Sequence, residues 1–135
     1  MNQDTRALLQ RYFDAFNSGN VQGMLACVSD DVVHDVNQGG RRTGKDLFGE
    51  FLLHMDRCYK EQLKDIVLMG NADGSRGSAE YMVHGTYKSD DEGLLRATGQ
   101  TYVLPAGSFF EVASGHIVRV TTYYNLKNWI EQVGG

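Results

Sequence analysis

The spacing of apolar residues changes part-way along the chain, and this change limits the folds that the chain can adopt. Residues 1–59 show the three-to-four spacing of helix faces, whereas residues 63–125 alternate as strands do. Helix faces are formed by residues 8–16, 21–28 and 47–59, and a β-branched run at 32–36 predicts one short strand among them. Later strands are predicted at residues 63–69, 77–88, 96–104, 107–113 and 116–125, with a last helical turn at 126–133. Helices followed by antiparallel strands are typical of an α+β fold. We therefore expect one domain, residues 1–135, in which a cone-shaped, curved antiparallel sheet packs on three N-terminal helices.

Two segments interrupt this pattern. Pro105 lies between two strand-like runs, where a proline predicts a bulge or a bend. Residues 38–44 are rich in glycine and precede the third helix. Such a segment is either a plain turn or a place where backbone amides hold a carboxylate or phosphate.

The charge of the chain argues against nucleic acid as a partner. Its 13 Lys and Arg residues are outnumbered by 17 Asp and Glu residues, and Arg41-Arg42 is the one adjacent basic pair. Phosphate binding needs clustered cations. No apolar run approaches the length of a membrane span, and the chain opens on polar residues rather than on an apolar signal segment. We expect a cytoplasmic protein that binds neither nucleic acid nor membrane.

Cysteines and histidines show no spacing typical of a metal site. Cys27 and Cys58 lie where helix periodicity places core residues, so buried free thiols are expected. His34 and Asp35 are neighbours in a predicted strand and point to opposite faces, which argues against a joint role. Neither a metal nor a cofactor is expected.

Asp35 is the leading candidate for a catalytic base. It lies in an apolar strand, next to Val36, where a charge is costly. A half-buried carboxylate has a raised pKa and can remove a proton next to a carbonyl. The structural alternative is a carboxylate that accepts hydrogen bonds from backbone amides of residues 37–44.

Tyr12, on the apolar face of the first helix, is either an oxyanion donor or a core aromatic. A pocket for a small apolar or amphipathic ligand needs further aromatic walls with a few polar groups. The expected ligand-binding residues are Phe16, His54, Met82, His84, Gln100, Tyr102, Tyr123, Asn125 and Trp129. Tyr123 and Tyr124 in succession place rings on both sheet faces, so we also expect the outer face to be covered in a symmetric homodimer.

Several short motifs carry a family resemblance. Arg11-Tyr12, Gly19-Asn20 and Ser29-Asp30-Asp31 precede Asp35 in an order similar to that of the ketosteroid isomerase, scytalone dehydratase and nuclear transport factor two superfamily, which includes SnoaL-like proteins. The resemblance implies that Tyr12 contributes to an oxyanion hole and that Asp35 is the base, with one residue deleted between Asp31 and Asp35. Further segments resemble the bacterial ketosteroid isomerase-related proteins. They are residues 34–41, 55–59, 84–87, 99–107 and 121–126.

The resemblance covers nearly the whole chain and leaves two functions open. One is a cofactor-independent enzyme of isomerase, dehydratase or cyclase type; epoxide opening, seen on the same fold, has only Asp35 to support it. The other is a binding protein with the same pocket. Ketosteroid isomerases carry a protonated aspartic acid on a late strand, where residues 104–108 here contain no carboxyl group. That difference favours the binding protein, whereas Tyr12 and Asp35 favour the enzyme.

Overall fold

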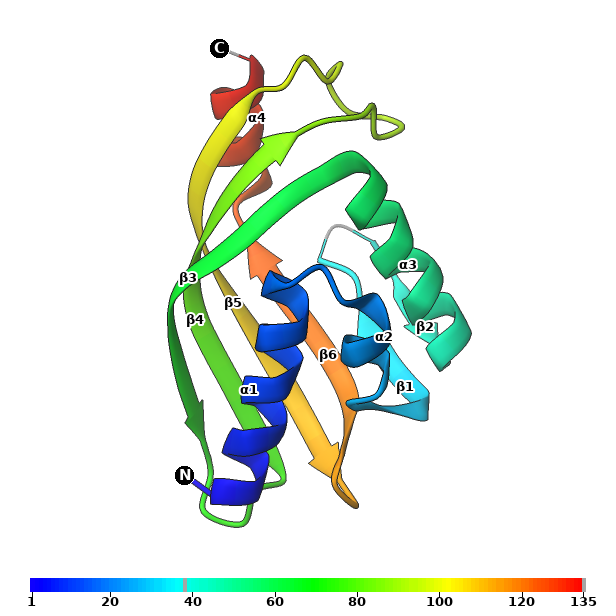
Figure 1. The fold of residues 1–135 in the computed structure, drawn as a ribbon, viewed down its shortest axis with the longest axis vertical. Coiled ribbons are helices and arrows are strands. Elements are labelled where there is room, and N and C mark those ends of the chain that lie inside the picture. The colour runs from blue at the N-terminus through cyan, green and yellow to red at the C-terminus, as the bar shows by residue number, and fades with distance from the viewer. Residues whose placement is uncertain (38, 135) are drawn as a thin grey trace.

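A computed structural model describes residues 1–37 and 39–134 as a curved, unclosed six-stranded sheet with helices packed against it (Figure 1). The elements are α1 (Gln3–Asn17), α2 (Val21–Leu25), β1 (Val28–Asp35), β2 (Arg41–Thr43), α3 (Lys45–Cys58), β3 (Tyr59–Gly70), β4 (Arg76–Tyr87), β5 (Thr101–Ala113), β6 (His116–Tyr124) and α4 (Leu126–Gly134). The α+β prediction is confirmed.

The sheet has the strand order β2-β1-β6-β5-β4-β3. Strands β3 to β6 form the predicted antiparallel meander, but β1 pairs in parallel with β6, which makes the sheet mixed. In β3 the register shifts between Lys64 and Val67, and Asp65 has a positive φ of 57°. Such a bulge bends a strand and increases its twist. The bend curves the sheet around the helices, as Figure 1 shows.

The first helix forms the centre of the core. The Asn2 side chain caps α1 by accepting hydrogen bonds from the backbone N–H groups of Asp4 and Thr5. Leu9 and Phe13 on the inner face are almost fully buried. Phe13 packs against Tyr81 of β4 and Phe110 of β5, so α1 is fixed across the middle of the sheet. Among the described residues, no helix is both long enough and apolar enough to cross a membrane.

Several predicted boundaries are corrected by the structure. The second helix ends at Leu25, and Val28 is instead a fully buried residue of β1. Tyr59 is not on a helix face but begins β3, where its ring stacks on Tyr87. The strand predicted from residue 96 begins at Thr101.

Pro105 does not divide two strands, because β5 is continuous through it. β6 pairs with β5 only from Ala106 onward, so the proline lies just beyond that ladder. The missing N–H group therefore removes no hydrogen bond to β6.

Candidate functional site

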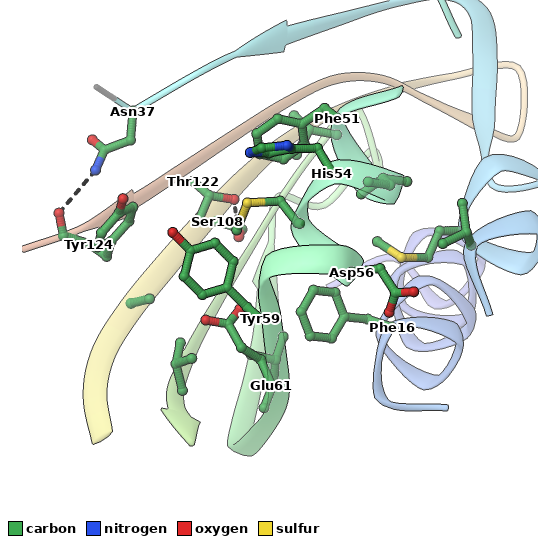
Figure 2. A pocket seen from close by; sticks show the side chains of 18 of the residues that line it. Phe16, Asn37, Phe51, His54, Asp56, Tyr59, Glu61, Ser108, Thr122 and Tyr124 are labelled. Atoms are coloured by element: carbon green, nitrogen blue, oxygen red, sulfur yellow. Dashed lines mark hydrogen bonds between the residues drawn. The ribbon is translucent and has the colours of Figure 1, made fainter. Parts of the chain in front are cut away.

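A cavity of about 1030 Å³ opens between the helices and the inner face of the sheet. Figure 2 shows Phe16 and Phe51 reaching it from α1 and α3, with Tyr59, Glu61, Ser108 and Thr122 coming from the sheet. More than half of the lining residues are aromatic or aliphatic, and the rest are mainly polar or charged. Cavities of this kind are typical of sites for small organic molecules.

Glu61 is the carboxyl group of the inner sheet face, and the sequence analysis missed it. Glu61 of β3 pairs with Gly85 of β4, and Gly85 pairs in turn with Tyr102 of β5. The Tyr102 ring crosses over Gly85, and its hydroxyl donates a short hydrogen bond to Glu61 Oε2. A Cβ atom at position 85 would overlap that ring, so the contact requires a glycine there.

The surroundings of Glu61 disfavour its charged form. Burial raises the pKa of the Glu61 carboxyl, and the hydrogen bond from Tyr102 offsets only part of that effect. Burial raises the pKa values of Tyr81 and Tyr124, and the charge of Glu61 adds a smaller effect in the same direction. A carboxyl group with a raised pKa in an apolar cavity suits proton transfer at carbon.

A cluster of hydroxyl groups lies on the same inner face. The Tyr81 and Ser108 hydroxyls are 2.7 Å apart, and Ser108 Oγ is 2.8 Å from Thr122 Oγ1 (Figure 2 marks the latter contact). Tyr12 of α1 lines the same cavity; burial raises its pKa, and Tyr81 adds a smaller effect in the same direction. We call Tyr12, Tyr81, Ser108 and Thr122 the hydroxyl cluster. Ser108 stands in the segment where the resemblance indicated a missing carboxyl group.

His34 also faces the interior. Its ring packs edge-on against Phe48 and Phe51 of α3, and the residue is buried. Burial, with a smaller effect from Arg42, lowers the His34 pKa to about 4. Within the part of the chain that the structure describes, Nδ1 is buried without a hydrogen-bond partner. His34 is therefore a neutral imidazole at neutral pH.

The carboxylate of Asp35 lies on the opposite face from the His34 ring. Although Asp35 borders the cavity, Arg41 binds its carboxylate through two contacts of 2.7 and 3.0 Å, and Thr121 Oγ1 donates a third at 3.2 Å. The bond from Arg41 is the main reason why the Asp35 pKa is lowered. This corrects the expectation of an apolar setting with a raised pKa.

The other predicted ligand-binding residues divide into two groups. Phe16, His54, Tyr102 and Trp129 line the cavity together with Tyr12. The residues outside the lining are Met82, His84, Gln100, Tyr123 and Asn125.

Strand alternation and local hydrogen bonds account for the second group. On β4, Tyr81 and Val83 are buried inward, so Met82 and His84 belong to the other face. Tyr124 lines the cavity in place of Tyr123.

The side chains of Gln100 and Asn125 form local hydrogen bonds in the loop before β5 and at the two ends of α4. Gln100 donates hydrogen bonds to the carbonyls of Arg96 and Val133, and the Asn125 side chain accepts one from the N–H of Asn128 at the start of α4. In the segment 38–44, interpreted above as either a plain turn or an anion site, Gln38 lies outside the described residues and Arg41–Thr43 form the strand β2. Three possible metal ligands, His54, Cys58 and Asp91, meet at the edge of the cavity.

Comparison with known proteins gives the family of the chain. The family model of the SnoaL-like domain matches residues 9–120. A solved structure from Pseudomonas putida, provisionally described as a polyketide cyclase, is 58% identical, covering 93% of this chain and 95% of its own, with a TM-score of 0.92. Another from Silicibacter sp., with the same description, is 54% identical over 98% and 97% of the two chains, with a TM-score of 0.96.

More distant similarity shows the fold alone. An NTF2-like protein from Burkholderia xenovorans is 14% identical over 98% of each chain, with a TM-score of 0.79. A search of curated proteins finds no significant match.

Proposed function

The chain belongs to the SnoaL-like domain family, and we propose that it is a cofactor-free enzyme that moves a proton at carbon in a small, mostly apolar carbonyl or hydroxyl compound. The observation that supports this proposal is that Glu61, a half-buried carboxyl group with a raised pKa, and the hydroxyl cluster line the same cavity. Isomerisation, dehydration and aldol-type cyclisation all begin with the same proton transfer.

In the proposed mechanism, the Glu61 carboxylate removes a proton from the carbon next to the substrate carbonyl. Negative charge then develops on the carbonyl oxygen. Tyr12, which the sequence analysis assigned to this role, and the hydroxyls of Tyr81 and Ser108 donate hydrogen bonds to that oxygen. Protonated Glu61 returns the proton to the same molecule, at carbon for an isomerisation or at a departing hydroxyl for a dehydration.

In this proposal the base is Glu61 rather than Asp35. The carboxylate of Asp35 is neutralised by Arg41 and has a lowered pKa, which weakens it as a base. We propose that Asp35 instead joins β1 to its neighbours, because Arg41 lies opposite it on β2 and Thr121 lies opposite it on β6.

The alternative is a binding protein that uses the same cavity without catalysis. Residues 104–108 offer the neutral hydroxyl of Ser108 where ketosteroid isomerases carry a protonated aspartic acid. The lack of that carboxyl donor favours this alternative.

We expect purified protein to retain a small organic molecule, and mass spectrometry of the denatured protein would identify it. For an enzyme, this compound incubated with the protein in D2O should gain deuterium next to its carbonyl, since proton removal is reversible. NMR or mass spectrometry measures that gain. A tightly bound compound that gains no deuterium above the protein-free rate would favour the binding protein.

We also propose a symmetric homodimer formed through the outer face of β5 and β6. Phe109 and Tyr123 pack edge to face there, with ring centroids 5.8 Å apart, and they are 48% and 54% exposed. Paired aromatic rings with this exposure are typical of interface cores. Light scattering should give twice the mass of the chain at micromolar concentration, and Phe109→Glu should halve it. A wild-type monomer would contradict the proposal.

A further inference from the structure

Three side chains with metal-binding atoms converge at the edge of the cavity. His54 and Cys58 lie one turn apart near the end of α3, and Asp91 lies in the loop between β4 and β5. His54 Nε2 is 2.9 Å from Asp91 Oδ1 and 4.0 Å from Cys58 Sγ. All three ligand atoms lie within 4.8 Å of one another.

The arrangement differs from that of a catalytic triad. In a triad, the nucleophile and the carboxylate use different nitrogens of the histidine ring. Here Cys58 Sγ and Asp91 Oδ1 both approach the same nitrogen, His54 Nε2. A single ion could therefore lie between the three atoms. The donor atoms of a tetrahedral zinc site are about 3.3–3.8 Å apart, as follows from bond lengths of about 2.0–2.3 Å. To reach that geometry, the 2.9 Å pair must open and the 4.0 Å pair must close by about half an ångström, and the Cys58–Asp91 pair, which lies within 4.8 Å, must close by up to about an ångström.

The surroundings orient two of the three ligands. The Tyr59 hydroxyl donates a hydrogen bond of 2.7 Å to Asp91 Oδ2, and the backbone N–H of Asp91 donates one of 2.9 Å to the Tyr87 hydroxyl. These contacts hold the carboxylate with Oδ1 directed at His54. Outer contacts of this kind typically fix the ligands of metal sites. The Cys58 thiol is buried and donates to the backbone carbonyl of Asp90 at 3.6 Å.

We propose that His54 Nε2, Cys58 Sγ and Asp91 Oδ1 bind one divalent transition-metal ion of the zinc type. One nitrogen, one sulfur and one oxygen ligand suit Zn²⁺ or Co²⁺, whereas Mg²⁺ and Ca²⁺ prefer oxygen ligands alone. His54 and Asp91 both line the cavity, so the ion would lie at its edge. On binding, the Cys58 thiol releases its proton to solvent and becomes a thiolate.

Binding also requires His54 to carry its proton on Nδ1. Arg57 Nη2 now lies 3.3 Å from Nδ1 and can only donate to it, which favours a proton on Nε2. The exposed Arg57 side chain must therefore leave when the metal binds. Arg57 thus competes with the metal ion for His54.

The site does not follow from sequence spacing. His54 and Cys58 are four residues apart, but the third ligand lies 37 residues from His54. The proton transfer proposed for Glu61 does not depend on this ion, so the two proposals can fail separately.

The test is a titration of the metal-free full chain with CoCl2, followed by absorption spectroscopy. We expect one Co²⁺ per chain, a thiolate-to-cobalt charge-transfer band in the near ultraviolet, and loss of the band when ZnCl2 is added. Cys58→Ser should remove the band and weaken Co²⁺ binding by at least ~100-fold, more than a change to an outer contact would. Arg57→Gln should bind Co²⁺ more tightly than the wild type.

Cys27→Ser is the matched control, because Cys27 is the other buried free thiol and lies outside the cluster. It should keep the band unchanged. If Cys58→Ser does not fold, His54→Gln must give the same loss by binding assay. No charge-transfer band in the wild type, or a band that survives Cys58→Ser or His54→Gln, would overturn the proposal.

Discussion

Glu61→Gln is expected to slow proton exchange on the substrate of the cavity by about 10²- to 10⁴-fold and to leave the fold intact. Glutamine has the size of glutamate, and its carbonyl oxygen can still accept the hydrogen bond from Tyr102. The substitution therefore removes the proton acceptor while it keeps the packing. Deuterium incorporation into the compound retained by the protein measures the rate, and circular dichroism checks the fold.

The pH profile gives an independent check on the same group. Exchange in the wild-type protein should increase with pH as Glu61 loses its proton. Because burial raises the Glu61 pKa, the midpoint should lie above the ordinary glutamate value of 4.5. This rise should be absent in whatever activity remains in Glu61→Gln.

Asp35→Asn is the matched control, since it neutralises a carboxylate that Arg41 binds on the other sheet face. It should keep exchange within a few-fold of wild type. The reverse result, in which Asp35→Asn is inactive and Glu61→Gln is active, would reject Glu61 and restore the base that the sequence motifs indicate.

Acid should destabilise the protein between about pH 6.5 and pH 4 through His34. Its pKa is about 4 in the folded protein and 6.5 when unperturbed, so the unfolded chain takes up the proton first as the pH falls. The free energy of unfolding should therefore decrease through this window, by about 3 kcal/mol in total from this group. Above pH 6.5 the histidine is neutral in both states and the effect is absent.

Urea unfolding at several pH values would measure this dependence in the wild type and in His34→Phe. Phenylalanine keeps an aromatic ring against Phe48 and Phe51 but cannot be protonated. His116→Gln, which removes a histidine from an exposed position, controls for the loss of a titratable ring. Glu61 is present in all three proteins, so its own titration cancels in the comparison. An equal pH dependence in wild type and His34→Phe would contradict the prediction.

Periodicity was enough to predict the order of the helices and of most strands, but not the short strand β2, and it divided β5 in two. Helix faces such as Leu8–Phe16 repeat at a spacing that only a helix can bury, and the later alternation permits only strands. The parallel pairing of β1 with β6 was not predictable, because it joins residues about 90 positions apart through contacts that leave no local pattern.

The inner face of each strand was harder to predict. On β4, Tyr81, Val83 and Tyr87 lie on one face and Met82, His84 and Thr86 on the other, and Met82 and His84 were assigned to the pocket although the first face is the more apolar. On β6, Tyr123 and Tyr124 are alike in composition, so the sequence did not show which of the two faces the cavity. On β4, packing of Phe13 of α1 against Tyr81 marks the inner face.

Glu61 escaped notice because the third strand was predicted to begin at Leu63. The structure begins β3 at Tyr59, so Tyr59, Glu61 and Leu63 alternate on one face. Extending that alternation backward by two residues would have identified the carboxyl group. No periodic pattern could locate Asp91 in this way, because it lies in the loop between β4 and β5 rather than in a strand or helix.

Gly85 has a consequence for how this protein can change in evolution. Its missing side chain is the space through which the Tyr102 ring reaches Glu61, so positions 85 and 102 cannot vary independently. Any larger residue at 85 requires a smaller one at 102, and the effects of the two substitutions on stability should be strongly non-additive. A lineage that replaced both residues would free Glu61 from its phenol partner in the same step. The row 61–85–102 thus links the acidity of the carboxyl group to the packing of the cavity wall.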